Sequence, residues 1–400
     1  MTDLFWPGDH RAGGLMSDGA FLKALVAVEN SWLATLVERG VAPASAQADL
    51  SALVGEADAA ELAITAERDG NPVTGLVALL RSRTARDAAR WLHRGLTSQD
   101  VVDTALALCL RDVIAAIETH LDRQVRRLGE LTVKHRHDPM LARTLTQPAL
   151  PGTAGLKFAV WLGAVLDAAD TLRSLPAAAP QCGGAAGTLA AAVELTGSVE
   201  DALALTTTMA AKLALAPTLS WHTSRSRVTR AGDALVTCCD AWGHIANDVS
   251  LGGRAEIGEF SEGTGGGSST MPHKNNPVLT ILLRRNALAA PSLSAALHAA
   301  SAASVDERSD GGWHAEWASL RTLARRTVVA ASQATDLLTG LRFDVGRASA
   351  NMTAAEGIDA EQQTMAHLVG GSADGSYLGA TQRIIDATMS RATAYLKETS

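Results

Sequence analysis

The sequence predicts an all-α protein organised around a bundle of long helices. Apolar residues recur at steps of three and four over several long stretches, which is the pattern of amphipathic helices. One stretch alternates strictly between steps of three and four, the 3.5-residue repeat of helices that pack side by side. No segment shows sustained apolar and polar alternation between turn signals, so we expect no substantial sheet.

Shorter helices are expected in the first hundred residues, at about 20–40 and 48–66, because Gly70-Asn71-Pro72 and Gly95 interrupt the pattern there. The first long helix is expected to begin near Thr97-Ser98. Its apolar stripe consists of Leu106, Leu110, Val113, Ile117, Leu121, Val125 and Leu128.

Four more apolar stretches complete the expected bundle. One runs from Leu156 to Leu172. The strict 3.5-residue repeat comprises Val228, Ala231, Leu235, Cys238, Trp242, Ile245 and Val249. Another helix is expected after Asn276-Pro277, where proline suits a first turn, with a kink at Pro291. The last one runs from Trp317 to Leu341.

These elements suggest three domains: an N-terminal helical domain (1–98), a central long-helix bundle (99–344) and a small C-terminal helical domain (345–400). Glycines at 370, 371 and 375 break the last of these into shorter segments. The helices are Ala-rich and apolar on more than one face, so we expect neighbours from other chains to cover them. The sequence therefore predicts a homo-oligomer.

The composition argues against several classes of protein. A net charge of −7, a pI near 5.9 and only 8 Trp, 5 Phe and 2 Tyr argue against a nucleic-acid binder. No stretch has the roughly 18 apolar residues of a membrane span, and the first residues do not resemble a signal peptide, so a cytoplasmic location is expected. The four cysteines are expected to be core residues in a reducing compartment. The closest histidine pair, His135 and His137, lacks the ligand spacing of a structural metal site.

The segment 265–277 is the strongest chemical signal in the chain. Three glycines are followed by two serines, a threonine, Lys274 and Asn276, just before an expected helix. Such a loop could bind a carboxylate through its backbone N–H groups, or it could be a flexible linker with a serine cap. No Gly-Lys-Ser/Thr follows the glycines, so a phosphate-binding P-loop is excluded. The glycines at 183–187 do not follow a predicted strand, so they do not form a dinucleotide fingerprint.

The run from Gly267 to Pro277 resembles the GSSxMPxKxNP signature of the fumarase/aspartase superfamily, which is long and specific. Two further blocks, 93–105 and 143–151, agree with this superfamily in order and spacing, and the resemblance covers roughly residues 1–345. It implies a homotetramer whose core is a bundle of long helices from all four chains, with each active site built from three of them. It also implies a cofactor-free reaction that passes through an aci-carboxylate intermediate.

Within the superfamily, the segment 306–317 resembles the ERSxGxWHAEW segment of bacterial 3-carboxy-cis,cis-muconate cycloisomerases. Segments 183–188 and 221–225 resemble the same enzymes. Lyases of the adenylosuccinate type carry a paired His and Glu where this chain has Leu145 and Ile281. The absence of this pair suggests that no separate general acid serves a departing nitrogen group. Asn275 stands where Arg is usual, so one cation near the loop is missing.

The resemblance also implies roles for individual residues. Ser268 would transfer the proton, and Lys274 with Asn276 would hold the charge of the aci-carboxylate. No metal and no cofactor is implied. Thr97 would begin a helix whose N–H groups and dipole suit a carboxylate of a tricarboxylate substrate. The implied substrate-binding residues are His93, Thr97, Ser98, Gln147, Ser269, Met271, Asn276 and Arg308.

Some of these residues have an ordinary structural interpretation as well. Gln147 could simply cap the following helix. His222 and Arg225 could form a polar turn before the next long helix. His314 and Glu316 could be a solvent-facing pair near a helix start.

The leading hypothesis for function is a 3-carboxy-cis,cis-muconate cycloisomerase, which would form 4-carboxymuconolactone in protocatechuate breakdown, the beta-ketoadipate pathway. One alternative is a C–N lyase of the adenylosuccinate type, which Leu145 and Ile281 disfavour. The other is an inactive helical scaffold of the same fold, which the intact Ser268, Lys274 and Asn276 disfavour.

Overall fold

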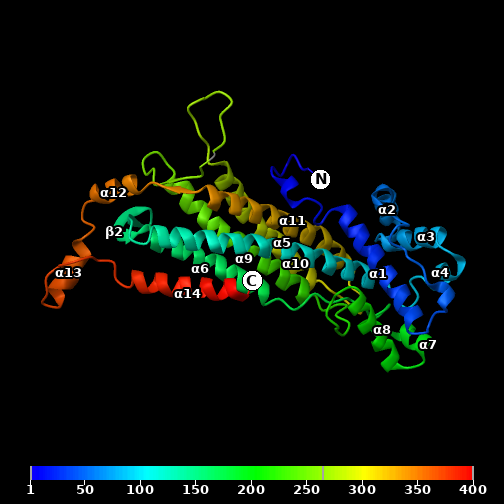
Figure 1. The fold of residues 1–400 in the computed structure, drawn as a ribbon. Coiled ribbons are helices and arrows are strands. Elements are labelled where there is room, and N and C mark those ends of the chain that lie inside the picture. Colours follow the sequence, from blue (N-terminus) through cyan, green and yellow to red (C-terminus); the bar gives the residue numbers. More distant parts are fainter. Residues whose placement is uncertain (1, 264, 399–400) are drawn as a thin grey trace. The chain divides into compact units, whose positions relative to one another are not determined.

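The computed structural model describes residues 2–263 and 265–398 and confirms the all-α prediction (Figure 1). In this described part of the chain, fourteen α-helices are accompanied by two antiparallel pairs of short strands. The chain divides into two compact units. Unit 1 consists of Met1–Ala115, Leu175–Asp233 and Ser292–Arg326, and unit 2 consists of Ala116–Ser174, Ala234–Pro291 and Thr327–Ser400.

Unit 1 contains the short helices of the chain's first half. These are α1 (Asp18–Glu38), α2 (Glu56–Asp69), α3 (Val73–Arg83), α4 (Arg86–Trp91), α7 (Ala190–Thr196) and α8 (Val199–Lys212). The helices expected at about 20–40 and 48–66 correspond to α1 and α2. Ser17 caps α1, because its hydroxyl accepts the N–H of Ala20 at 3.1 Å. Among the described residues, α1 is the one helix long and apolar enough to span a membrane by length and composition, and 61% of that stretch is buried.

Four long helices contribute residues to both units: α5 (Ser98–Lys134), α9 (Ser226–Gly252), α10 (Val278–Ala302) and α11 (Gly311–Gly340). The 3.5-residue repeat of α9 is buried, as predicted, and so is the stripe expected on α5 except for Leu110, which is half-buried. In unit 2, Trp242 of α9 donates its indole N–H to Oε1 of Gln124 on α5 at 2.7 Å. Gln124 in turn donates to the carbonyl of Ala331 on α11 at 3.0 Å. This chain of hydrogen bonds joins α5, α9 and α11 inside an apolar core. Pro291 lies inside α10.

Unit 2 also contains the strands and the C-terminal helices. They are β1 (Pro139–Thr144), β2 (Gln147–Thr153), α6 (Ala154–Arg173), β3 (Phe260–Ser261), β4 (Arg342–Phe343), α12 (Val345–Thr353), α13 (Ala360–Leu368) and α14 (Thr381–Glu398). Strand β1 pairs with β2, and β3 pairs with β4. Helix α14 packs along α6 (Figure 1), where the guanidinium of Arg173 stacks 3.8 Å from the ring centre of Tyr395. All four cysteines are buried and unbridged, as expected of core residues.

Candidate active site

The glycine-rich signature forms a long loop that precedes α10 in unit 2 and stands out in yellow-green in Figure 1. Its base is closed by Gly266 and Asn276, whose N–H groups donate to each other's carbonyls at 2.8 and 2.7 Å. The side-chain amide of Asn276 also donates to the carbonyl of Gly267 at 3.2 Å. A Cβ on Gly266 would lie 2.3 Å from Cγ2 of Val278, so only glycine fits there. The base of the loop is therefore fixed by backbone pairing.

Ser268 lies just beyond this closed base and is half-buried. Its Oγ accepts the backbone N–H groups of Met271 at 3.1 Å and Thr270 at 3.4 Å. Two N–H groups aimed at one oxygen stabilise negative charge on it, as in an oxyanion hole. The side chains of Ser269, Met271 and Lys274 are exposed on the same loop.

The β1–β2 hairpin of unit 2 carries Gln147. Leu145 and Thr146 form its turn with φ values of 48° and 70°. Gln147 is exposed and is the first residue of β2. Helix α6 is capped instead by Thr153, whose hydroxyl accepts the N–H of Leu156 at 3.2 Å. The interpretation of Gln147 as a helix cap is therefore wrong, because Gln147 begins β2 and the rest of this strand separates it from α6.

The start of α5 in unit 1 brings Thr97, Ser98 and Arg308 together. Ser98 is the first residue of the helix, and Nη1 of Arg308 donates to Oγ1 of Thr97 at 3.1 Å. The N–H of Thr97 donates to Asp100 at 2.9 Å, so this carboxylate already occupies part of the helix N-terminus. Burial raises the pKa of Asp100 to about 6, although backbone N–H groups, including that of Gly183, work in the opposite direction. The remaining polar groups that can face a ligand here are the two hydroxyls and the Arg308 guanidinium.

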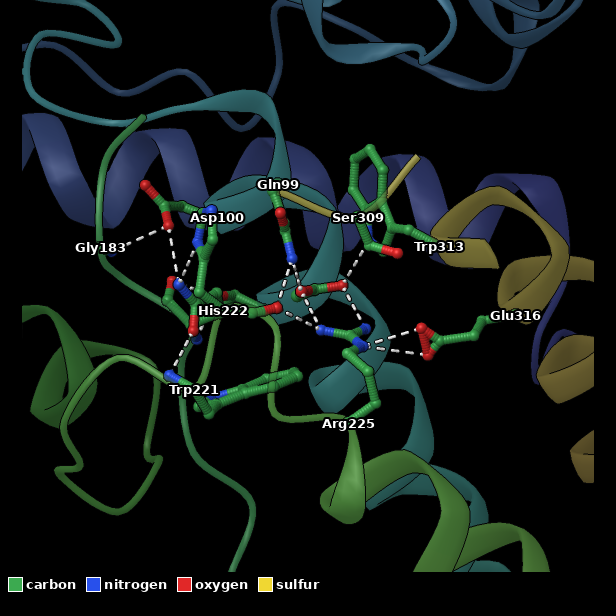
Figure 2. A network of polar contacts seen from close by, with 12 residues as sticks. Gln99, Asp100, Gly183, Trp221, His222, Arg225, Ser309, Trp313 and Glu316 are labelled. Carbon is green, nitrogen blue, oxygen red and sulfur yellow. Dashed lines mark hydrogen bonds and ion pairs between the residues drawn. The ribbon is translucent and has the colours of Figure 1, made fainter. Parts of the chain in front are cut away.

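A buried polar network in unit 1 lies next to this helix start (Figure 2). Arg225 donates to both oxygens of Asp103 at 2.7 and 3.0 Å, and its Nε donates to Glu316 at 2.8 Å. Trp313 and Gln99 donate to the same Asp103 carboxylate at 2.9 and 3.1 Å. The five side chains come from α5, the segment before α9 and the first two turns of α11, so the network ties these three elements together.

The charges of this network compensate one another. Burial lowers the pKa of the Arg225 guanidinium, but the two carboxylates outweigh this effect and the pKa is raised. Burial raises the pKa of Glu316, and Arg225 partly reverses this shift. Glu316 is 2% exposed, so the interpretation of Glu316 as solvent-facing is wrong. His314 is exposed, as that interpretation expected.

Sequence reasoning missed Gln99 and Asp103 as members of this network. Both are polar, lie four residues apart on one face of α5, and are 0% and 1% exposed. A pair of polar residues at this spacing, among the apolar residues near the start of the helix, was the available signal. Their other partners, which include Arg225 and Trp313, lie more than a hundred residues away in sequence, so the pattern could not identify them.

Replacing Arg225 with methionine is expected to lower the free energy of unfolding by about 3–5 kcal/mol, because Asp103 and Glu316 would stay buried without their cation. Denaturant unfolding followed by circular dichroism measures the change. The matched control is Arg391→Met, since Arg391 pairs with Asp167 and Asp170 while 41% of its side chain is exposed. The control should lose less than about 1 kcal/mol. Equal stability losses in the two variants would contradict the structural role given to Arg225.

The sequence-predicted residues thus divide between the two units. Unit 1 holds the start of α5 with His93 and Arg308, and unit 2 holds Gln147 and the Ser268 loop. Within residues 2–263 and 265–398, no group of three His, Cys, Asp or Glu side chains is arranged to hold a metal ion.

Comparisons with known proteins agree with this fold and these motifs. A lyase family model matches residues 20–290. A nitrosuccinate lyase from Streptomyces davaonensis is 41% identical over 349 residues, covering 84% of this chain and 73% of the relative. A 3-carboxy-cis,cis-muconate cycloisomerase from Bradyrhizobium diazoefficiens is 40% identical over 330 residues, covering 80% of this chain and 72% of the relative.

Solved structures show the same similarity. The 3-carboxy-cis,cis-muconate lactonizing enzyme from Pseudomonas putida superposes with a TM-score of 0.83 and 28% identity, covering 96% of this chain and 97% of the other. A fumarate lyase from Mesorhizobium sp. BNC1 superposes with a TM-score of 0.81 and 26% identity, covering 95% and 97%. The chain therefore belongs to the lyase family and is an enzyme of the fumarase/aspartase superfamily.

Proposed function

We propose that this enzyme is a 3-carboxy-cis,cis-muconate cycloisomerase that forms 4-carboxymuconolactone. The observation that carries the proposal against a lyase of the adenylosuccinate type is the pair Leu145 and Ile281, two apolar side chains that are 95% and 48% exposed. Lyases of the adenylosuccinate type place an imidazole and a carboxylate at these positions. Lactonisation expels no nitrogen group, so its site needs no acid there. Curated cycloisomerases at 40% and 37% identity support the same assignment.

The reaction is an isomerisation in which one C–O bond and one C–H bond form and one C=C bond is lost. A carboxylate of the substrate attacks an alkene carbon, and the electron pair of the double bond moves into the neighbouring carboxylate as an aci-carboxylate. Lys274 and Asn276 stabilise this charge, and Ser268 delivers a proton to the adjacent carbon. The N–H groups of Thr270 and Met271 then stabilise the oxygen that has given up its proton, until Ser268 takes up a proton from water.

The substrate is a tricarboxylate, so each carboxylate needs its own donors. Thr97, Ser98 and Arg308 supply one group of donors, and the Ser268 loop with Lys274 supplies another. Residues His93, Gln147, Ser269 and Met271 complete the proposed contacts. The enzyme works without a metal or cofactor, as a cytoplasmic homotetramer with sites shared between chains, in protocatechuate breakdown.

A second candidate function is the elimination of nitrite from nitrosuccinate, which the 41% identical nitrosuccinate lyase favours. A base removes a proton from the carbon next to a carboxylate, the aci-carboxylate forms, and the C–N bond breaks as nitrite leaves. Nitrite is a weak base, so this reaction also needs no general acid at positions 145 and 281. The two candidates therefore share the carboxylate contacts and differ in the group that leaves or attacks.

Parallel assays separate these possibilities. Purified enzyme is incubated with 3-carboxy-cis,cis-muconate, nitrosuccinate, adenylosuccinate and argininosuccinate at equal concentrations. We expect loss of the diene absorption of carboxymuconate, with the lactone confirmed by mass spectrometry. A higher kcat/KM for colorimetric nitrite release from nitrosuccinate would replace the proposed function by the second candidate. Turnover of the remaining two substrates alone would refute both.

The double variant Leu145→His/Ile281→Glu tests the importance of the apolar pair. We expect it to lose carboxymuconate turnover, because it places an imidazole and a carboxylate in a site that uses neither. It should not gain adenylosuccinate cleavage, because purine and phosphate contacts remain absent. Ultraviolet assays with carboxymuconate and with adenylosuccinate measure the two outcomes. Robust adenylosuccinate cleavage by this variant would show that the substrate assignment is wrong.

A further inference from the structure

The imidazole of His93 contacts the carboxylate of Glu29, a residue that lies outside the sequence motifs. Nδ1 of His93 lies 2.6 Å from Oε1 of Glu29 on α1. Glu29 is completely buried, whereas 18% of the His93 side chain is exposed. A carboxylate accepts hydrogen bonds, so we assign the proton to Nδ1 of His93. The nitrogen that remains for a ligand is therefore Nε2.

One oxygen of the Glu29 carboxylate, Oε1, makes this contact. Within the described residues, its second oxygen, Oε2, is buried and has no hydrogen-bond partner. Arg81 is a charged neighbour of Glu29. Burial and the charge of Arg94 lower the pKa of Arg81, and the charge of Glu29 raises it. Glu29 thus sits in a partly compensated buried environment and places its one hydrogen bond on the imidazole.

The backbone around His93 is fixed by the same elements. His93 has a φ of 65°, a left-handed conformation that costs a non-glycine residue about 1 kcal/mol or more. Arg81 donates to the carbonyl of Leu92 at 2.9 Å, and the indole of Trp32 donates to the carbonyl of Arg94 at 2.7 Å. Glu29 and Trp32 lie three residues apart on α1 and so face the same side. One face of α1 therefore holds both the ring and the main chain at His93.

We propose that Glu29 is the positioning residue of the active site, which fixes His93 through Nδ1 and presents Nε2 to the substrate. This inference rests on the proposed function only in placing His93 against the substrate. A buried carboxylate that accepts from Nδ1–H also fixes the tautomer in which Nε2 carries the free lone pair. Glu29 and His93 together would supply an oriented imidazole to the site. The adenylosuccinate-type lyases have an imidazole and a carboxylate at positions 145 and 281, where this chain has Leu145 and Ile281.

The first test measures His93 without any substrate. Diethyl pyrocarbonate acylates the unprotonated nitrogen of an accessible imidazole, and peptide mass spectrometry gives the rate at each histidine. We expect the rate at His93 to fall several-fold in Glu29→Gln and further in Glu29→Met.

The control is Asp138→Asn, because Asp138 contacts Nδ1 of His135 at 2.7 Å in the same way. This control should leave the rate at His93 unchanged. An unchanged rate at His93 in both Glu29 variants would overturn the proposal.

The second test measures coupling between the two residues with whichever substrate the wild-type enzyme converts. Glu29→Gln should lower kcat/KM by at least about tenfold. In a His93→Gln background, the added Glu29→Gln change should have no further effect, because a positioning residue acts only through its partner. If the losses in kcat/KM of the two single variants multiply in the double variant, the proposal is overturned. If Glu29→Gln does not assemble, we use Glu29→Asp instead, which moves the carboxylate away from His93. The same single and double variants are then compared. Failure of the wild type to convert carboxymuconate would refute the proposed function and leave the His93 labelling result standing.

Discussion

Replacing Ser268 with alanine is expected to lower kcat/KM by about a thousandfold or more while leaving the oligomer and its helix content intact. The expected loss combines removal of the proton donor with removal of the oxygen that the Thr270 and Met271 N–H groups stabilise. The fold should survive because Ser268 lies on a loop whose base is closed by Gly266 and Asn276 without it. Steady-state kinetics, circular dichroism and native mass spectrometry measure the three properties.

Ser269→Ala is the matched control, since it removes the neighbouring hydroxyl from the same loop. Ser269 is exposed, and the resemblance to the superfamily gives it a supporting contact only. We expect a clearly smaller loss than for Ser268→Ala. Activity of Ser268→Ala within tenfold of wild type would contradict its assignment as the proton-transfer group.

The helices could be predicted because their cause is local. The stripe on α5 and the 3.5-residue repeat on α9 are periodicities within one segment, and all the residues that form them except Leu110 are buried. The β1–β2 hairpin could not be predicted in this way. Pro148 and Pro151 fall inside β2, and proline cannot donate to a strand ladder, so the segment lacks the usual signature of a strand.

The candidate site was accessible from the sequence where it is a contiguous motif. The loop around Ser268 and the block at Thr97 were both identified on residues that stand next to one another. The contacts of Glu29 with His93 and of Arg225 with Asp103 join residues 64 and 122 positions apart. Nothing in a single sequence records such pairings, so only the folded chain could reveal them.

Mixed tetramers of two impaired variants are expected to recover activity, because we propose that different chains bring Gln147 and Arg308 to one substrate. Arg308 contacts Thr97 just before α5, and the hairpin with Gln147 follows the end of α5. A helix of 37 residues is about 55 Å long. If both residues contact one substrate, as we propose, they must come from different chains.

The variants are Arg308→Ala and Gln147→Ala, each of which should have little activity when refolded alone. When they are unfolded together in equal amounts and refolded, random assembly should give about a quarter of the sites both intact residues, and activity should approach that fraction of wild type. The control mixes each variant with Ser268→Ala/Arg308→Ala/Gln147→Ala, a triple variant that supplies neither an intact Arg308 nor an intact Gln147 to a shared site. This mixture should recover nothing. An absence of recovery in the first mixture, when native mass spectrometry shows mixed tetramers, would refute the shared site, and so would a wild-type enzyme that is active as a monomer.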